Sequence, residues 1–190
     1  SQATRDAFDI SSEPQSVRER YGDDLNAMSM LMARRLVERG CGFVTVVDCT
    51  WDFHNDGNNP ATVEGMNVLG PQADHAIAAF MDDLEDRGLT DKVLLLVTGE
   101  MGRSPKKQSN GGTGHWGRLT PLLVAGGGLK MGQVIGKTDR NGGEATTKQY
   151  LPQHLLATIL QTVFDPGEAR LDSSIPTDLA RLMTVGEPIR

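Results

Sequence analysis

The sequence predicts an α/β domain built on a mostly parallel, three-layer α/β/α sheet. Apolar runs typical of buried strands alternate with segments that have helical periodicity, and long polar loops follow the strands. The order helix, strand, helix, strand, strand, helix is typical of such a sheet covered by helices on both faces. Because 190 residues suit one hydrophobic core and no linker or repeat divides them, we expect a single domain over residues 1–190.

Helices are predicted where apolar residues recur every three or four positions between capping residues. Asp23 or Asp24 can cap the start of the second helix, and Gly40 can end it. Pro71 is expected near the first turn of the third helix, and Gly88 is expected to stop that helix. The predicted helices cover residues 13–22, 24–39, 72–87 and 153–163.

Strands are predicted over Phe43–Val47, Val93–Val97 and Leu119–Ala125, and Gln133–Lys137 is a candidate short edge strand. The first run is unbroken and β-branched, which suits a parallel strand covered on both faces. The three glycines Gly126–Gly128 end the third run. We expect the first three strands to be neighbours in one sheet.

The charge balance disfavours nucleic acid as a partner, and the hydropathy pattern predicts no membrane-spanning segment. Nineteen Lys and Arg against 25 Asp and Glu give a net charge of −6, which disfavours nucleic acid as a partner. The longest apolar run, Val93–Val97, is far shorter than the roughly 20 residues of a membrane span. Cys41 and Cys49 bracket a predicted strand and would lie about 26 Å apart, so we expect two thiols that do not pair with each other.

Asp52, His54 and His115 form a candidate metal site. Asp52 and His54 follow the first predicted strand, and His115 lies in the loop that follows the second. One carboxylate and two imidazoles suit zinc or another divalent metal and leave a position open for water or substrate. The alternative is a hydrogen-bonded loop aspartate with an unrelated histidine. Glu100, directly after the second strand, is either a further metal ligand or partner of a metal-bound histidine, or a capping carboxylate.

A basic stretch lies beside the candidate ligands. No acidic residue occurs from Met101 to Thr138, whereas Arg103 and Arg118 fall within that interval together with four lysines. These arginines are candidate anion-binding residues, which predicts a small anionic ester such as a phosphate or sulfate as the substrate. The alternative is an ordinary solvated loop.

Several segments together are similar to a known family. Val97–Arg103, Gly114–Trp116, Leu122–Gly128 and Gly132–Asp139 resemble the uncharacterised, sulfatase-like family known as domain of unknown function fifteen hundred and one. Three further segments fit it too: Ala33–Glu38, Trp51–His54 and Gly186–Arg190.

This resemblance implies a likeness to the alkaline phosphatase superfamily, whose members use two divalent metals and a Ser, Thr or Cys nucleophile. It implies that Asp52, His54 and His115 are ligands of one metal and that Glu100 stands in place of an aspartate ligand of the second. Met101 stands where the superfamily has a histidine, and Asp52 and His54 are closer in sequence than its usual spacing.

The resemblance also implies a function and a context. The expected activity is metal-dependent hydrolysis of phosphate or sulfate esters, with zinc as the expected metal and manganese or calcium as other candidates. The alternatives are a non-catalytic binding domain with a degenerate metal site and a phosphoryl-transferring mutase. The nucleophile and a further metal-binding aspartate are expected in an upstream N-terminal half of the same protein, and an exported or periplasmic location is expected.

Overall fold

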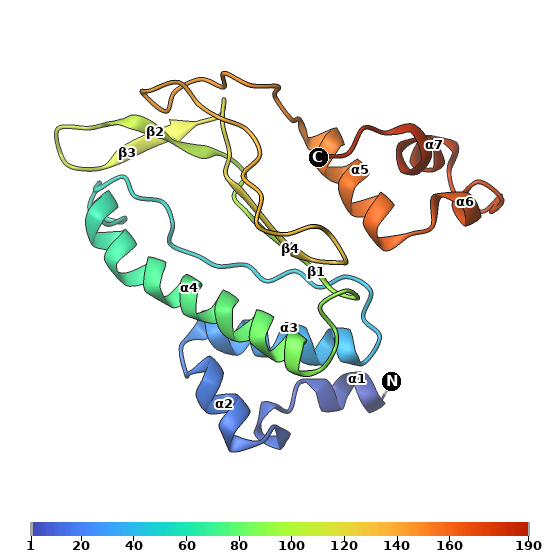
Figure 1. Ribbon diagram of the computed structural model, residues 1–190. Coiled ribbons are helices and arrows are strands. Elements are labelled where there is room, and N and C mark those ends of the chain that lie inside the picture. Colours follow the sequence, from blue (N-terminus) through green and yellow to red (C-terminus); the bar gives the residue numbers. More distant parts are fainter. Residues whose placement is uncertain (1, 190) are drawn as a thin grey trace. The chain divides into compact units, whose positions relative to one another are not determined.

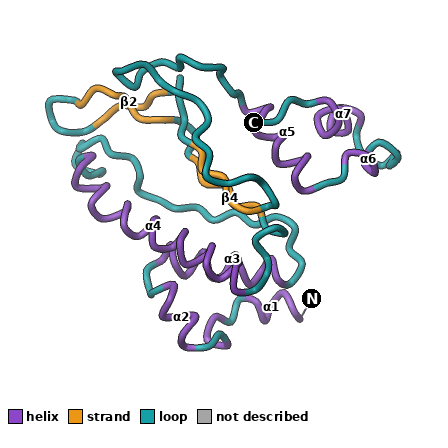
Figure 2. Tube along the Cα trace, in the orientation of Figure 1, coloured by secondary structure: helices purple, strands orange, loops and turns teal. Residues whose placement is uncertain are grey.

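The computed structural model describes residues 2–189 (Figures 1 and 2). The chain groups into two compact units, residues 1–89 with 106–114 and residues 90–105 with 115–190. The single domain predicted over residues 1–190 stays a prediction. Helices dominate, and the strands are short.

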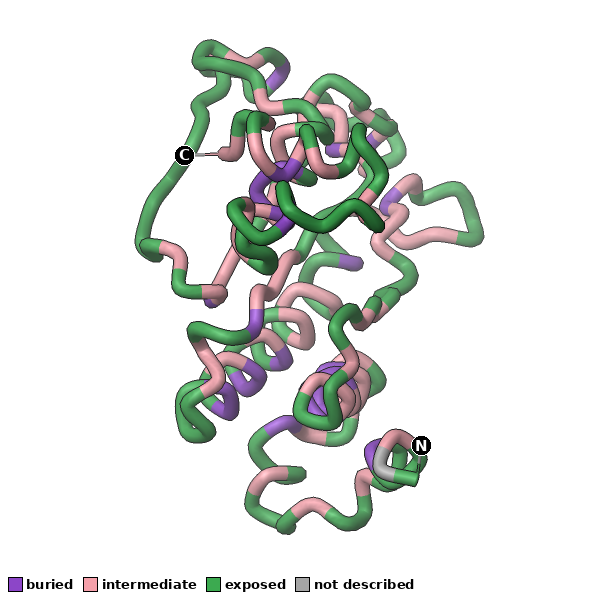
Figure 3. The backbone as a smooth tube through the Cα atoms, turned by 90° about the vertical axis from the view of Figure 1, so that its right-hand side faces the viewer, coloured by how far each residue is buried: buried purple, intermediate pink, exposed green. Residues whose placement is uncertain are grey.

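The first unit is mainly helical (Figure 1). Helix α3 packs against α4, and α2 contacts both of them. Both α3 and α4 contribute buried residues to the core of this unit, and Figure 3 colours buried residues purple along the backbone. The elements are α1 (Gln2–Ala7), the 3-10 helix η1 (Ile10–Ser12), α2 (Gln15–Tyr21), α3 (Leu25–Glu38) and α4 (Thr62–Asp86).

Helix α3 begins and ends where its capping residues predict. The Asp24 side chain accepts a hydrogen bond from the Ala27 N–H at 2.9 Å, which satisfies a donor that the first turn leaves unpaired. Gly40 follows the helix with a φ of 86°, a left-handed conformation that suits glycine. The predicted helix over 24–39 is confirmed, and α2 confirms the core of the helix predicted over 13–22.

A buried charged cluster joins the helices of this unit. Arg34 of α3 donates from Nε to Asp83 of α4 at 2.7 Å, and its other nitrogens donate to Glu38 at 2.6 Å and Glu13 at 2.8 Å. The Tyr21 hydroxyl donates to the same Asp83 carboxylate at 3.1 Å. Because buried charges are costly without partners, this cluster ties α2, α3 and α4 into one arrangement.

Contacts within the cluster shift the pKa values of Arg34 and Glu13 so that both stay charged, whereas Tyr21 stays neutral. Burial lowers the pKa of Arg34, but its hydrogen bonds to Glu13 and Glu38 and the charge of Asp83 raise it above its ordinary value. Burial raises the pKa of Glu13, but the Arg34 hydrogen bond and the charges of Arg34 and Arg35 outweigh burial and lower it. Burial, followed by the Asp83 charge, raises the pKa of Tyr21, which therefore stays a hydrogen-bond donor.

Helix α4 is longer than predicted. It begins at Thr62 instead of residue 72, so Pro71 lies inside the helix and not near its first turn. Proline inside a helix removes one backbone hydrogen bond, and tertiary packing of the preceding turns can outweigh that loss. Gly88, with a φ of 64°, follows the end of the helix as predicted.

The second unit contains an antiparallel pair of strands. β1 (Leu94–Thr98) pairs with β4 (Leu122–Gly126), with Leu94 opposite Gly126 and Thr98 opposite Leu122. Two strand runs predicted from the sequence are thereby confirmed as neighbours in one sheet, and they pair antiparallel where a mostly parallel sheet was expected. The three glycines Gly126–Gly128 all have positive φ and form a turn after β4. The Gly127 N–H donates to the Thr90 and Val93 carbonyls, so this turn is bound to the residues that precede β1.

A second pair of strands was not predicted. β2 (Gly102–Lys107) and β3 (Thr113–Trp116) pair with each other through the turn 108–112. The sequence of β2 contains Pro105 and two lysines, so it lacks the apolar alternation that would indicate a strand. The candidate edge strand over Gln133–Lys137 is not a strand in the structure.

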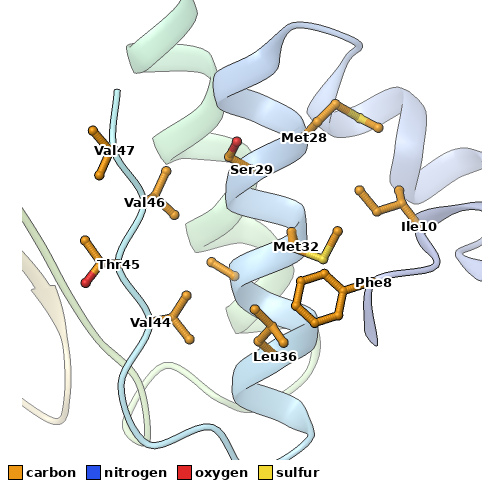
Figure 4. A pocket seen from close by; sticks show the side chains of 11 residues that line it. Phe8, Ile10, Met28, Ser29, Met32, Leu36, Val44, Thr45, Val46 and Val47 are labelled. Atoms are coloured by element: carbon orange, nitrogen blue, oxygen red, sulfur yellow. The ribbon is translucent and has the colours of Figure 1, made fainter. Parts of the chain in front are cut away.

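The predicted strand Phe43–Val47 has no strand partner within residues 2–189. The segment is extended beside α3, and its side chains alternate: Val44 and Val46 point toward the helix, while Thr45 and Val47 point away (Figure 4). Within the described chain, no backbone group of these five residues forms a hydrogen bond. The alternation typical of a strand is therefore present without the ladder that defines one.

The C-terminal helices pack around a small core. α5 (Pro152–Val163) confirms the helix predicted over 153–163, and it contacts α7 (Thr177–Val185). α7 also contacts α6 (Pro166–Ala169). The core residues are Leu160, Ala169 and Met183, with Ile175 and Leu182 packed against them.

The remaining sequence-based expectations concern membranes and thiols. Across residues 2–189, no helix combines the length and the apolar character that a bilayer span requires. Cys41 and Cys49 are both free thiols, as predicted.

Candidate metal centre

The loop that carries Asp52 and His54 is anchored by the residue between them. Phe53 is buried, and its ring lies against Gly65 of α4 so closely that a Cβ at Gly65 would be 2.2 Å from a ring carbon. The Phe53 carbonyl accepts a hydrogen bond from the Thr113 N–H of β3 at 2.8 Å. Asp52 and His54 therefore flank a residue that is fixed on both its side chain and its backbone.

The turn between β2 and β3 holds His54 from the other side. The His54 carbonyl accepts a hydrogen bond from Asn110 Nδ2 at 3.0 Å. Gly112 lies against the same carbonyl, and a Cβ there would be 2.1 Å from the His54 oxygen. Only glycine allows the turn and the loop to approach this closely.

His115 reaches the same place along β3. Thr113, which binds Phe53, and His115 are two residues apart on one strand. Residues two apart on a strand have side chains on the same face. The Thr113 side chain, on the same face, contacts Thr62 Oγ1 at 3.3 Å.

Asp52, His54 and His115 converge, as predicted. Each offers a ligand atom, and these atoms all lie within 4.8 Å of one another. Asp52 Oδ1 is 3.0 Å from His54 Nε2. The side chain of Asp52 is 47% exposed and that of His54 24% exposed, and His115 is exposed as well. Solvent therefore reaches the group.

This geometry fits a single divalent ion. Ligand atoms about 2.0–2.2 Å from a tetrahedral zinc lie roughly 3.4 Å apart. Asp52 and His54 are already at about this separation, and the longest separation, at most 4.8 Å, needs to close by about 1.4 Å, which side-chain rotation in an exposed group can provide. Three protein ligands leave a fourth position for water or substrate, as in catalytic zinc sites.

Of the other predicted site residues, Glu100 is not part of this ligand group, and the two arginines are predicted to bind an anion and not the metal. Glu100 is exposed in the bend after β1 and is not among the three clustered ligands. Arg103 is partly buried in β2. Arg118 forms an ion pair with Glu144 and lies over the Trp116 ring, 5.7 Å from its centroid. The pair is largely exposed to solvent, and one guanidinium nitrogen of Arg118 takes part in it.

A groove elsewhere in the first unit contains none of the predicted site residues. Its volume is about 400 Å³, and the extended segment Val44–Val47 forms one wall of it (Figure 4). Residues of α3 with Phe8 and Ile10 line the rest, and the lining is mainly apolar. The candidate metal ligands and this groove are therefore separate features.

Sequence reasoning did not identify the residues that hold the ligands in place. These are Phe53, Gly65, Asn110, Gly112 and Thr113. One signal was available, because Asn110-Gly111 is a dipeptide typical of a tight turn between two strands. The close approaches at Gly65 and Gly112 are tertiary contacts that no local pattern indicates.

Comparison with known proteins gives a family but no function. No curated protein and no solved structure matches the chain. A family model described as a protein of unknown function, DUF1501, matches residues 1–167. Since this match covers most of the sequence, the chain belongs to the DUF1501 family of proteins of unknown function.

Proposed function

We propose that this chain binds one divalent metal ion through Asp52, His54 and His115 and is part of a metal-dependent hydrolase of phosphate or sulfate esters. The observation that carries the proposal is the convergence of one carboxylate and two imidazoles within 4.8 Å. A metal held there would polarise the ester and balance charge that develops on its oxygens.

Zinc is the metal that this ligand set favours. Two imidazole nitrogens suit zinc, whereas calcium prefers six to eight oxygen ligands and the group offers one carboxylate. Manganese prefers carboxylate, carbonyl and water ligands and is the weaker candidate.

The hydrolase proposal also depends on the resemblance to sulfatase-like and alkaline phosphatase proteins. In that interpretation Arg103 attracts the anionic ester, and an upstream part of the protein supplies the nucleophile. An exported location and a three-layer sheet belong to the same proposal. Turnover by the 190-residue chain alone is then expected to be slow.

A non-catalytic binding domain is the second candidate. Two observations favour it: Glu100 lies outside the ligand group, and Arg118 is paired with Glu144. A chain that binds one metal ion and whose Arg118 is paired with Glu144 would retain metal binding without catalysis.

Metal analysis tests the shared part of both candidates. We expect the purified chain, equilibrated with zinc and dialysed, to retain one zinc ion per chain. His54→Ala and His115→Ala should each abolish stoichiometric uptake. His75→Ala is the matched control, because His75 is exposed on α4 and is not in the ligand group. Equal zinc retention by the wild type and both ligand variants would overturn the proposal.

An ester assay separates the two candidates. The zinc-loaded chain is incubated with aryl phosphate and aryl sulfate esters, with and without the remainder of the protein. Turnover that requires His54 supports the hydrolase. One bound zinc without turnover in either preparation supports the binding domain.

A further inference from the structure

The loop over residues 52–60, which carries Asp52 and His54, is called the metal loop below. Asn110 is the residue of the β2–β3 turn whose side chain forms the hydrogen bonds to this loop. Its Nδ2 donates to the His54 carbonyl at 3.0 Å and to the Asn55 carbonyl at 3.0 Å. Its Oδ1 accepts from the Gly112 N–H at 3.0 Å. One amide side chain therefore binds two successive carbonyls of the loop and stabilises its own turn.

Asn55 completes the contact from the opposite side. Its Nδ2 donates to the Asn110 carbonyl, so the two asparagines bind each other's backbone. The Asn55 N–H donates to the Pro60 carbonyl at 3.1 Å. Asn55 has a φ of 51°, a left-handed conformation that asparagine tolerates better than most residues. The chain thus turns sharply directly after His54.

This arrangement controls the position of the His54 ring. The His54 carbonyl is bound by Asn110, and the preceding Phe53 carbonyl is bound by Thr113. Successive bound carbonyls leave the backbone at His54 little rotational freedom, so the direction in which its side chain leaves the loop is fixed. If the two Asn110 donors are lost, the carbonyls of His54 and Asn55 gain water as an alternative partner, and the loop can rotate away from β3.

We propose that Asn110 is a positioning residue that holds His54 for metal binding, an inference that rests on the proposed metal site. Asn110 does not belong to the ligand group and acts only through the backbone of the loop. Groups that orient metal ligands typically contribute 10–100-fold to metal affinity.

Asn110→Asp separates positioning from turn stability. The aspartate keeps an oxygen that can accept from the Gly112 N–H, but it has no donor for the two loop carbonyls. Asn59→Ala is the matched control, because Asn59 lies in the same loop and, among residues 2–189, its side chain binds Asp56 and not the β2–β3 turn.

The test measures zinc affinity by competition with a chelator, the visible spectrum of the cobalt-substituted protein and the midpoint of urea unfolding. We expect Asn110→Asp to weaken zinc binding by about 10–100-fold and to change the cobalt spectrum, with a small shift in the urea midpoint. Asn59→Ala should match the wild type in all three. Unchanged affinity and spectrum for Asn110→Asp overturn the proposal, as does an affinity loss that the Asn59→Ala variant shares.

A measurement without metal distinguishes failure of this inference from failure of the metal site. The Thr113 amide proton is held by the Phe53 carbonyl, so its hydrogen exchange reports whether the loop stays on β3. If the wild-type protein retains no zinc and the Thr113 amide exchanges faster in Asn110→Asp than in the wild type, Asn110 positions the loop but the metal site is rejected. Unchanged exchange, whatever the zinc result, sinks the positioning role.

Discussion

Arg34 and Asp83 form a buried ion pair between α3 and α4. Arg34 Nε donates to Asp83 Oδ2 at 2.7 Å, and the two side chains are 1% and 3% exposed. The same guanidinium binds Glu13 and Glu38, so three carboxylates share one arginine. Such a cluster contributes less net stability than its contacts suggest, but removing Arg34 leaves these carboxylates largely buried with Arg35 and Arg87 as their remaining cations.

Arg34→Ala should therefore lower the free energy of unfolding by about 3–5 kcal/mol, the range for breaking a buried pair. Urea unfolding followed by circular dichroism measures the loss. Arg20→Ala is the control, because its partner Asp86 is 61% exposed and a solvent-screened pair contributes little. Equal midpoints for Arg34→Ala and Arg20→Ala would show that the cluster does not stabilise the helices.

Acid should weaken the same cluster through Glu13. The pKa of Glu13 lies below its ordinary value of 4.5, because its arginine contacts outweigh burial. A carboxyl group whose pKa is lowered on folding stabilises the protein above its unfolded pKa, and this contribution is lost as the pH falls through the folded pKa. We expect stability to decline as the pH falls below about 4.5.

The Glu13→Gln variant isolates this contribution. Its melting temperature at pH 7 should be lower than that of the wild type, and the difference should shrink as the pH falls below 4.5. Melting curves collected from pH 7 down to pH 3 provide the comparison. A difference that is constant over this range would rule out ionised Glu13 as the source.

Gly65→Ala should destabilise the protein although alanine is a better helix former. The new methyl group would lie 2.2 Å from the Phe53 ring, and overpacking of a filled site costs about 1–3 kcal/mol. Gly42→Ala, where a Cβ meets no atom within 4 Å, is the control and should shift the urea midpoint little. A lower midpoint for Gly65→Ala alone is the expected result; equal midpoints for the two variants would mean that Phe53 is not packed on Gly65.

Gly112→Ala should displace the metal loop. Its Cβ would be 2.1 Å from the His54 oxygen, and a backbone atom cannot move aside as a flexible side chain can. We expect zinc affinity to fall at least tenfold, by the same positional argument as for groups that orient metal ligands. Gly117→Ala, where a Cβ meets no atom within 4 Å, should bind zinc like the wild type. Wild-type affinity in Gly112→Ala would contradict the close approach of turn and loop.

Features set by local chemistry were predictable from the sequence. Asp24, Gly40 and Gly88 act through their own backbone and the adjacent turn, and the structure confirms all three. Asp52, His54 and His115 were predictable from their residue types, but the expected reason was wrong: the run before Asp52 is not a strand in the structure, and His115 lies in β3 and not in a loop.

Features set by tertiary contacts were not predictable. Pro71 indicates a helix start by local rules, yet α4 begins nine residues earlier at Thr62, whose N–H donates to the Gly111 carbonyl. The direction of β1 relative to β4 depends on the path of the chain between them, which apolar runs do not encode. Phe43–Val47 has the composition of a strand, but pairing requires a second strand, and composition cannot supply one.

The unpaired segment Phe43–Val47 affects how the protein behaves in concentrated solution. Phe43 and Val47 are 80% and 77% exposed, and the backbone between them forms no hydrogen bond with any other part of residues 2–189. An edge of this kind is a template for intermolecular β-pairing and hence for aggregation. The purified protein should associate as its concentration rises, as light scattering would show. The Val47→Lys variant should be more soluble and should retain zinc like the wild type.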